Sequence, residues 1–209
     1  MTNGLSGVRA DQTFSYRALE RAADRVREYL RFPVDRAIDT LRLFEDLHEI
    51  SIRLRDGTVI PFRGGVVALE DSEGYTRYDR QRRTIEILAS EETYYRLEKA
   101  HPRAGYFVAH ELGHCLLHTD QLVRLAQMPS HQQAAFHRGR AGHKPYEDTE
   151  WQANGFASAL LMPARGIHLL EQAHKNLTPA LVAARFRVSL EAAGYRTQLY
   201  QNRRNELLS

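Results

Sequence analysis

The chain has 209 residues, of which 43% are hydrophobic and 26% charged, a composition typical of one soluble globular domain. Its formal net charge of +3 at pH 7 is too small to predict nucleic-acid binding by itself. The single cysteine, Cys115, excludes an internal disulfide, and no apolar run is long enough for a signal peptide or a membrane span, so we expect a cytoplasmic protein without a membrane partner.

The N-terminal part is predicted to be helical after a short leader. Residues 1–14 are polar and are expected to form a flexible leader. Apolar residues then recur at helical spacing in two segments, 15–31 and 33–48. We therefore expect a helical pair over residues 15–48.

Between residues 50 and 88 the pattern changes to that of strands. Residues 50–54 and 58–60 flank Asp56-Gly57, a common hairpin turn. Two further strands are predicted at 64–69 and 83–88, with a polar loop at 71–75 between them. This arrangement indicates a small antiparallel sheet. The last strand is our candidate for an edge that takes up substrate as an added strand, although an inner position suits its sequence equally well.

The next segment, residues 103–118, is apolar on nearly every side and therefore indicates a buried helix, preceded by a short one at 91–100. It contains His110 and His114, which lie one turn apart on the same face and can bind one metal ion together. Glu111 projects beside that ion, where a zinc peptidase holds its general base. The spacing therefore predicts a catalytic zinc helix.

A catalytic zinc ion needs a third protein ligand. The position that a metzincin would use is Asp120, which lacks the expected imidazole. Glu150 is the better candidate, because it begins a second apolar helix that ends before Pro163. Asn154 lies one turn further on and is expected to accept the N–H of a zinc-bound histidine.

Other roles for these side chains stay open. Glu147 and Asp148 are rival ligands, since they directly precede the same helix. Glu150 can also serve as an acid that stabilises the start of a helix. The residue that stabilises the oxyanion is not identified by the sequence, and His118 and Tyr106 are weak candidates.

Two further segments are candidate binding surfaces. Residues 121–144 are basic, contain three histidines and no carboxylate, and are expected to form a solvated loop, with a cleft wall for an acidic substrate as the alternative. Residues 178–201 imitate a helix-turn-helix with caps at Thr178 and Ser189. Apolar residues along both helices favour packing on the rest of the domain, so direct nucleic-acid binding is not expected.

The segments 110–118 (HELGHCLLH) and 150–163 (EWQANGFASALLMP) resemble the ImmA/IrrE family of metallopeptidases. The resemblance is most specific over residues 103–163. It implies a gluzincin-like zinc site; the ligands are His110, His114 and Glu150, and the catalytic residue is Glu111. It also implies cleavage of helix-turn-helix transcriptional repressors that control mobile-element or stress genes.

Together these patterns predict an α+β fold with N-terminal helices, a small antiparallel sheet and a zincin-like helical bundle. One domain is expected over residues 15–205, with zinc-site helices at 103–163 and further helices at 164–201. The expected function is zinc-dependent cleavage of a protein partner, and Mn²⁺ also suits the ligand set. The alternative is a metal-stabilised module that sequesters a repressor without cutting it. Glu111 favours the enzyme, because structural zinc sites usually have four protein ligands and no base.

Overall fold

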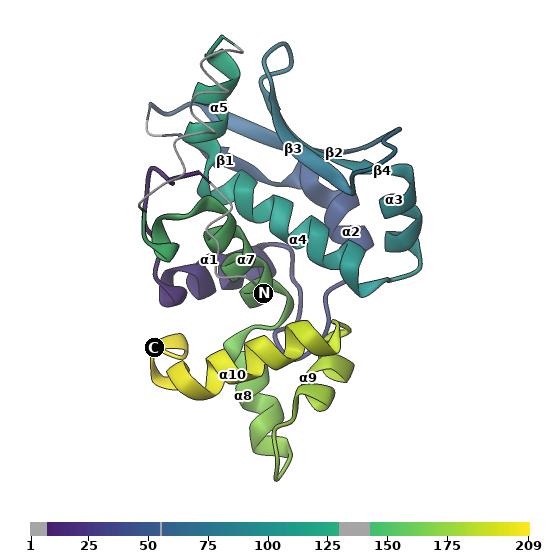
Figure 1. Cartoon of the computed structure of the whole chain (residues 1–209), viewed down its shortest axis with the longest axis vertical. Helices are drawn as coiled ribbons and strands as arrows, with labels where there is room; N and C mark the ends of the chain where they lie inside the picture. The colour runs from purple at the N-terminus through teal and green to yellow at the C-terminus, as the bar shows by residue number, and fades with distance from the viewer. Residues whose placement is uncertain (1–7, 55, 130–142) are drawn as a thin grey trace.

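The computed structural model describes residues 8–54, 56–129 and 143–209. A sheet lies at one end of the molecule and the C-terminal helices lie at the other (Figure 1). The strands are β1 (Ser51–Arg53), β2 (Val59–Val67), β3 (Gly74–Asp79) and β4 (Thr84–Ser90). The helices are α1 (Tyr16–Tyr29), α2 (Thr40–Glu45), α3 (Glu91–Glu98), α4 (Pro102–Leu117), α5 (Thr119–Gln127), α7 (Thr149–Leu161), α8 (Ala164–Ala173), α9 (Pro179–Phe186) and α10 (Leu190–Leu207), with short 3₁₀ turns at Asp46–Glu49 and Pro145–Glu147.

The α+β class is confirmed, but the sheet is mixed and not wholly antiparallel. Its strand order is β1-β2-β4-β3, and β2 runs parallel to β4. Strand β2 joins the strands predicted at 58–60 and 64–69, and the start of β3 falls in the loop predicted at 71–75. Because β3 forms a hairpin with β4 on the outside, β4 returns alongside β2 in the same direction.

The predicted substrate edge was also wrong. Strand β4 lies between β2 and β3, and all seven of its residues are buried. The outer strand on this side is β3, whose side chains alternate in exposure. No strand among the described residues pairs with the outer edge of β3.

The N-terminal predictions need two corrections. Helix α2 begins only at Thr40, because the side chain of Asp39 accepts the backbone N–H of Arg42 and caps the helix there. Part of the predicted flexible leader is held in place: Ala10 N–H donates to Glu147 O at 2.7 Å, and Thr149 N–H donates to Val8 O at 3.0 Å. Residues 1–7 lie outside the described residues.

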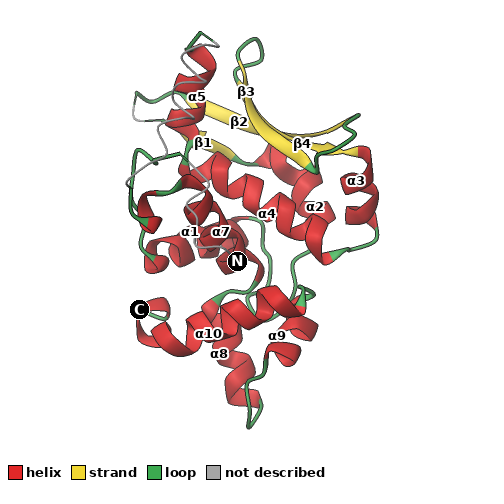
Figure 2. Cartoon of the chain, viewed as in Figure 1, coloured by secondary structure: helices red, strands yellow, loops and turns green. Residues whose placement is uncertain are grey.

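Helix α4 lies between the sheet and α7, and α7 in turn packs against α1 (Figure 2). The contact between α4 and α7 is close. A Cβ added at Gly113 would lie 3.1 Å from Ala153 Cα and 3.2 Å from Ala153 O. The missing side chain therefore lets the two helices that carry the predicted ligands approach each other.

The C-terminal helices α9 and α10 begin at the caps Thr178 and Ser189, as predicted. Arg196, on the second of these helices, is buried, forms an ion pair with Glu20 and donates to Met162 O at 2.8 Å. It therefore ties α10 to the rest of the protein and cannot enter a DNA groove. Among the described residues, no helix combines the length and apolar character that crossing a bilayer requires.

Candidate metal centre

Helices α4 and α7 bring His110, His114 and Glu150 together at one point. The two histidine Nε2 atoms are 3.1 Å apart. The carboxylate of Glu150 places Oε2 at 3.2 Å from His110 Nε2 and Oε1 at 3.2 Å from His114 Nε2. The imidazoles are 16% exposed and the carboxylate 36%, so the group is sheltered yet open on one side.

This donor set fits a divalent metal ion. With metal–ligand bonds of about 2.0–2.2 Å, the donors of a tetrahedral site lie about 3.3 Å apart, close to the separations found here. Two imidazole nitrogens and one carboxylate are the ligands of many catalytic zinc sites. The group is the one set of three metal-binding side chains found within the described part of the chain.

Protons compete with a metal ion for the same atoms. Hydrogen bonds from His110 and His114 hold the pKa of Glu150 far below its usual range. Burial opposes protonation of His110, but Glu150 and the nearby charge of Glu111 outweigh it and raise the pKa of His110. Because a metal ion needs the deprotonated imidazole, its binding must weaken in acid.

His110 is oriented by Asn154. The Nδ1–H of His110 donates to Asn154 Oδ1 at 3.1 Å, an assignment that leaves the Nε2 lone pair directed at the metal group. The hydroxyl of Tyr106 donates to the same oxygen at 2.9 Å, and burial raises the pKa of Tyr106 to about 12. The structure thus brings Asn154 to His110, and the hydroxyl of Tyr106, an oxyanion candidate, is engaged with Asn154.

His114 is oriented by a chain of contacts that the sequence reasoning missed. His118 Nδ1 lies 3.2 Å from His114 Nδ1, and His118 Nε2 lies 2.9 Å from Gln152 Oε1. Burial, aided by the charge of His114, lowers the pKa of His118 to about 4, so His118 is neutral near pH 7. In the neutral tautomer that fits both contacts, the Nε2–H of His118 donates to Gln152 Oε1, and its Nδ1 accepts the Nδ1–H of His114. His118, proposed for the oxyanion, instead fixes the His114 ring.

Glu111 lies beside the metal group and does not join it. Its Oε2 accepts the hydroxyl of Thr76, on β3, at 2.7 Å. Thr76 also lies against Cys115, with 3.9 Å between Oγ1 and Sγ. Complete burial raises the pKa of Cys115, which therefore stays a thiol in the core. The contact of Thr76 with Glu111 could not be foreseen because β3 itself was not predicted.

The rival ligands are engaged elsewhere. Glu147 accepts the backbone N–H of Lys144 at 2.9 Å and pairs with Arg9 at 3.2 Å. Asp148 caps α7 through the N–H of Trp151 and lies 2.9 Å from His143 Nε2. Asp120 is exposed on α5. Among these acids and Glu150, Glu150 is the carboxylate that the structure brings together with His110 and His114.

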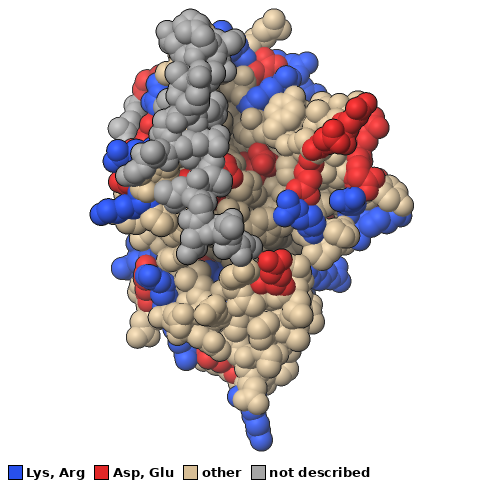
Figure 3. Space-filling view, viewed as in Figure 1, with Lys and Arg blue, Asp and Glu red and all other residues tan. Residues whose placement is uncertain are grey.

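The basic segment 121–144 is only partly described. Its residues 121–127 belong to α5, and His143 is buried against Asp148. Residues 130–142, which include His131 and His137, lie outside the described residues. On the face shown in Figure 3, basic and acidic side chains of the described residues are interspersed.

Comparison with known proteins identifies a family over much of the chain. The family model of the IrrE N-terminal-like domain, Peptidase_M78, matches residues 66–198, a range that contains α4 and α7 entirely. No curated protein sequence matches the chain. A solved structure, a Mycobacterium tuberculosis transcriptional regulator, is similar at 18% identity and a TM-score of 0.44. The similarity covers 84% of this chain and 44% of that one, so this chain spans less than half of that structure.

Proposed function

Because the chain belongs to the Peptidase_M78 family, whose model describes the IrrE N-terminal-like domain, we propose that it is a metal-dependent endopeptidase. The ion would be held by His110 and His114 on α4 and by Glu150 on α7. Zn²⁺ is the ion that the ligand set suits best, and Mn²⁺ is also compatible with it. When bound, such an ion supplies Lewis acidity that polarises a peptide carbonyl and acidifies water.

Glu111 is the proposed general base. It follows the ligand His110 directly and remains outside the ligand group. Thr76 holds Oε2 of Glu111 by a hydrogen bond, which fixes the orientation of the carboxylate. A carboxylate in this position can take a proton from water and deliver it to the departing amine.

The family resemblance and the sheet favour a protein as the substrate. The outer edge of β3 is not paired with a strand among the described residues, and Thr76 on β3 contacts Glu111. An extended peptide that adds to this edge would therefore pass beside the proposed base. From the resemblance to the ImmA/IrrE family we propose a helix-turn-helix transcriptional repressor as the substrate.

One observation carries this proposal. The Nε2 atoms of His110 and His114 lie 3.1 Å apart, and each lies 3.2 Å from a different carboxylate oxygen of Glu150, which is 40 positions after His110 in the sequence. The carboxylate of Glu111, next to His110 in the sequence, stays outside this group. A structural metal site would usually be closed by a fourth protein ligand. The convergence of three donors and a neighbouring base therefore supports catalysis over a purely structural role.

The test compares the wild type with Glu111→Gln, using a purified helix-turn-helix repressor as the probe. The amide keeps the shape of the side chain but cannot take up a proton. We expect cleavage, measured by mass spectrometry, to fall by at least about 100-fold while the metal content stays unchanged. If Glu111→Gln relieves repression in cells as well as the wild type does, the protein sequesters its partner and the peptidase proposal fails.

A further inference from the structure

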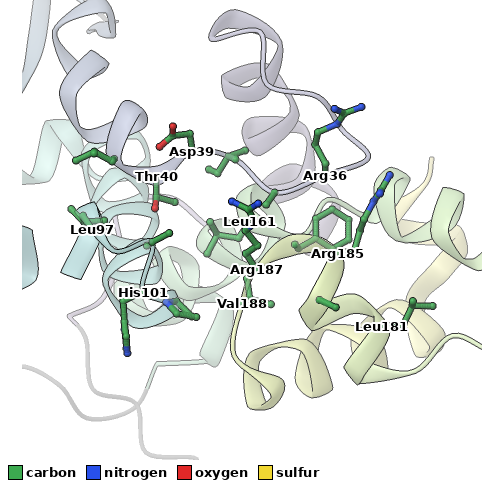
Figure 4. A pocket seen from close by; sticks show the side chains of 18 of the residues that line it. Arg36, Asp39, Thr40, Leu97, His101, Leu161, Leu181, Arg185, Arg187 and Val188 are labelled. Carbon is green, nitrogen blue, oxygen red and sulfur yellow. The ribbon is translucent and has the colours of Figure 1, made fainter. Parts of the chain in front are cut away.

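A cavity of about 750 Å³ is lined by residues at the start of α4 and at the end of α7, and none of His110, His114 and Glu150 belongs to its lining (Figure 4). Its walls come from the residues before and within α2, the ends of α3 and α7, the start of α4, and α8 and α9. Apolar side chains contribute much of the lining, among them Ile38, Leu97, Leu161, Phe186 and Val188. Its size lies within the range that small-molecule sites occupy, about 300–1,000 Å³.

The cavity has more positive than negative side chains. Three arginines line it, Arg36, Arg185 and Arg187, against two carboxylates. Arg36 and Arg185 share one carboxylate, that of Asp35, at 3.4 and 2.9 Å. Arg187 has no ion pair with any carboxylate in the described ranges 8–54, 56–129 and 143–209.

The two acidic residues of the lining do not neutralise Arg187. Asp39 uses its carboxylate to cap α2 by accepting the N–H of Arg42 at 3.0 Å. Glu98 is exposed at the end of α3. The guanidinium of Arg187 is therefore available to an anion from outside the chain.

The backbone of Arg187 is unusual for its residue type. It ends α9 in the left-handed conformation, with φ 53° and ψ 44°, and its N–H donates to Ala183 O. Glycine is the residue that this helix-ending position favours, because a side chain there is strained. Arginine at this position places a guanidinium among the side chains that line the cavity (Figure 4).

We propose that this cavity binds a small amphipathic anion, with Arg187 holding the anionic group and the apolar walls holding the rest. A guanidinium pairs with carboxylate or phosphate through two parallel hydrogen bonds and is more weakly hydrated than an ammonium group. Leu161 ends α7 and Gly105 lies in the first turns of α4, so the ligand would touch both helices that carry the metal group. Binding at this cavity would not depend on peptidase activity.

The test uses hexanoate as the probe, with hexanamide as a neutral match and acetate as an anion without the apolar part. Binding is followed through amide chemical shifts of the full chain. We expect hexanoate to shift residues around Leu161 and Val188. Removing the charge-assisted pair, by using hexanamide or by Arg187→Gly, should weaken binding at least about tenfold.

Arg31→Gly is the matched control. Arg31 also has a left-handed backbone, with φ 58°, and does not line the cavity. Both variants remove one positive charge and relieve the same strain, so neither should lower the melting temperature. Hexanoate should bind Arg31→Gly as it binds the wild type. Equal binding to Arg187→Gly and the wild type, equal binding of hexanamide, or no hexanoate binding at all would overturn the proposal.

Discussion

Helix α7 has a polar cluster at each end, and the two clusters are built on opposite principles. Near its start, Glu150 meets His110 and His114 in a partly open group. Beyond its end, Glu20 and Arg196 form a buried ion pair, 5% and 1% exposed. Around that pair, Arg196 donates to Met162 O at 2.8 Å, and Glu20 accepts the N–H of Ala164 at 3.1 Å.

A second arginine, Arg27, donates hydrogen bonds to backbone carbonyls at the end of α7. Arg27 donates from Nε to Leu160 O at 2.8 Å and from Nη2 to Leu161 O at 3.4 Å, and it also bonds to Pro33 O. Every charge in this cluster meets an opposite charge or a carbonyl within the chain. In the other group, two imidazole nitrogens and a carboxylate converge on a shared point. A cluster whose charged groups all have hydrogen-bond or ion-pair partners within the chain stabilises the fold, whereas lone pairs that converge on one point predict a bound ligand.

The largest expected effect on stability belongs to the closed cluster. Arg196→Met leaves the Glu20 charge buried without its partner, which should lower the free energy of unfolding by about 3–5 kcal/mol. The double variant Glu20→Leu with Arg196→Met should recover much of that loss, because both charges are removed. Urea unfolding of the two single variants and the double variant measures the coupling. If the double variant loses as much free energy of unfolding as the two single variants lose together, Glu20 and Arg196 do not stabilise each other and the described ion pair is contradicted.

Removing the side chain that orients His110 should lower the affinity for a metal ion and leave the free energy of unfolding nearly unchanged. Asn154→Ala removes the acceptor of the His110 Nδ1–H, and the affinity for Zn²⁺ should fall about 10–100-fold. Asn154→Asp keeps an oxygen acceptor and serves as the control, so it should bind more tightly than the alanine variant. Competition with a chromophoric chelator gives both affinities. Equal Zn²⁺ affinity in the alanine variant and the wild type would show that Asn154 does not orient the histidine.

The smallest expected effects come from two helix glycines. Gly113→Ala would press a methyl group against Ala153, and should destabilise the metal-free protein by about 1–2 kcal/mol. Gly194→Ala, on α10, meets no atom within 4 Å and should stabilise it by about 0.5–1 kcal/mol. Denaturant unfolding measures whether each variant lowers or raises the free energy of unfolding. Stabilisation by Gly113→Ala would mean that the α4–α7 contact is looser than described.

The side chains that meet in the proposed metal group could be nominated from the sequence, because most of their arrangement depends on spacing within single helices. His110 and His114 lie four residues apart, as do Glu150 and Asn154, and this spacing places each pair on one helix face whatever the surrounding fold. Of the two helix caps Ser189 and Asp39, only Ser189 was predicted. Ser189 follows a visible break between two apolar helical patterns, whereas Asp39 lies inside one continuous helical pattern, so nothing in the sequence indicated that a helix begins there.

The contacts that could not be foreseen join elements distant in the sequence. Thr76 reaches Glu111 only because β3 forms the outer edge of the sheet, and Gln152 reaches His118 across the α4–α7 contact. Strand β3 lacks a strong apolar alternation, so neither its existence nor the parallel pairing of β2 with β4 was evident. Such contacts depend on pairing between elements, which local periodicity does not encode.

The most direct test of the account is the metal content of the purified chain and of three variants. Elemental analysis should find about one divalent ion per wild-type chain, as in other sites with three protein ligands. His114→Ala and Glu150→Gln should lose that ion while keeping their helical circular-dichroism signal. Glu147→Gln, three residues from the proposed ligand, should keep it. Metal content that is unchanged in Glu150→Gln, or lost in Glu147→Gln, would contradict the claim that the three convergent side chains hold the ion.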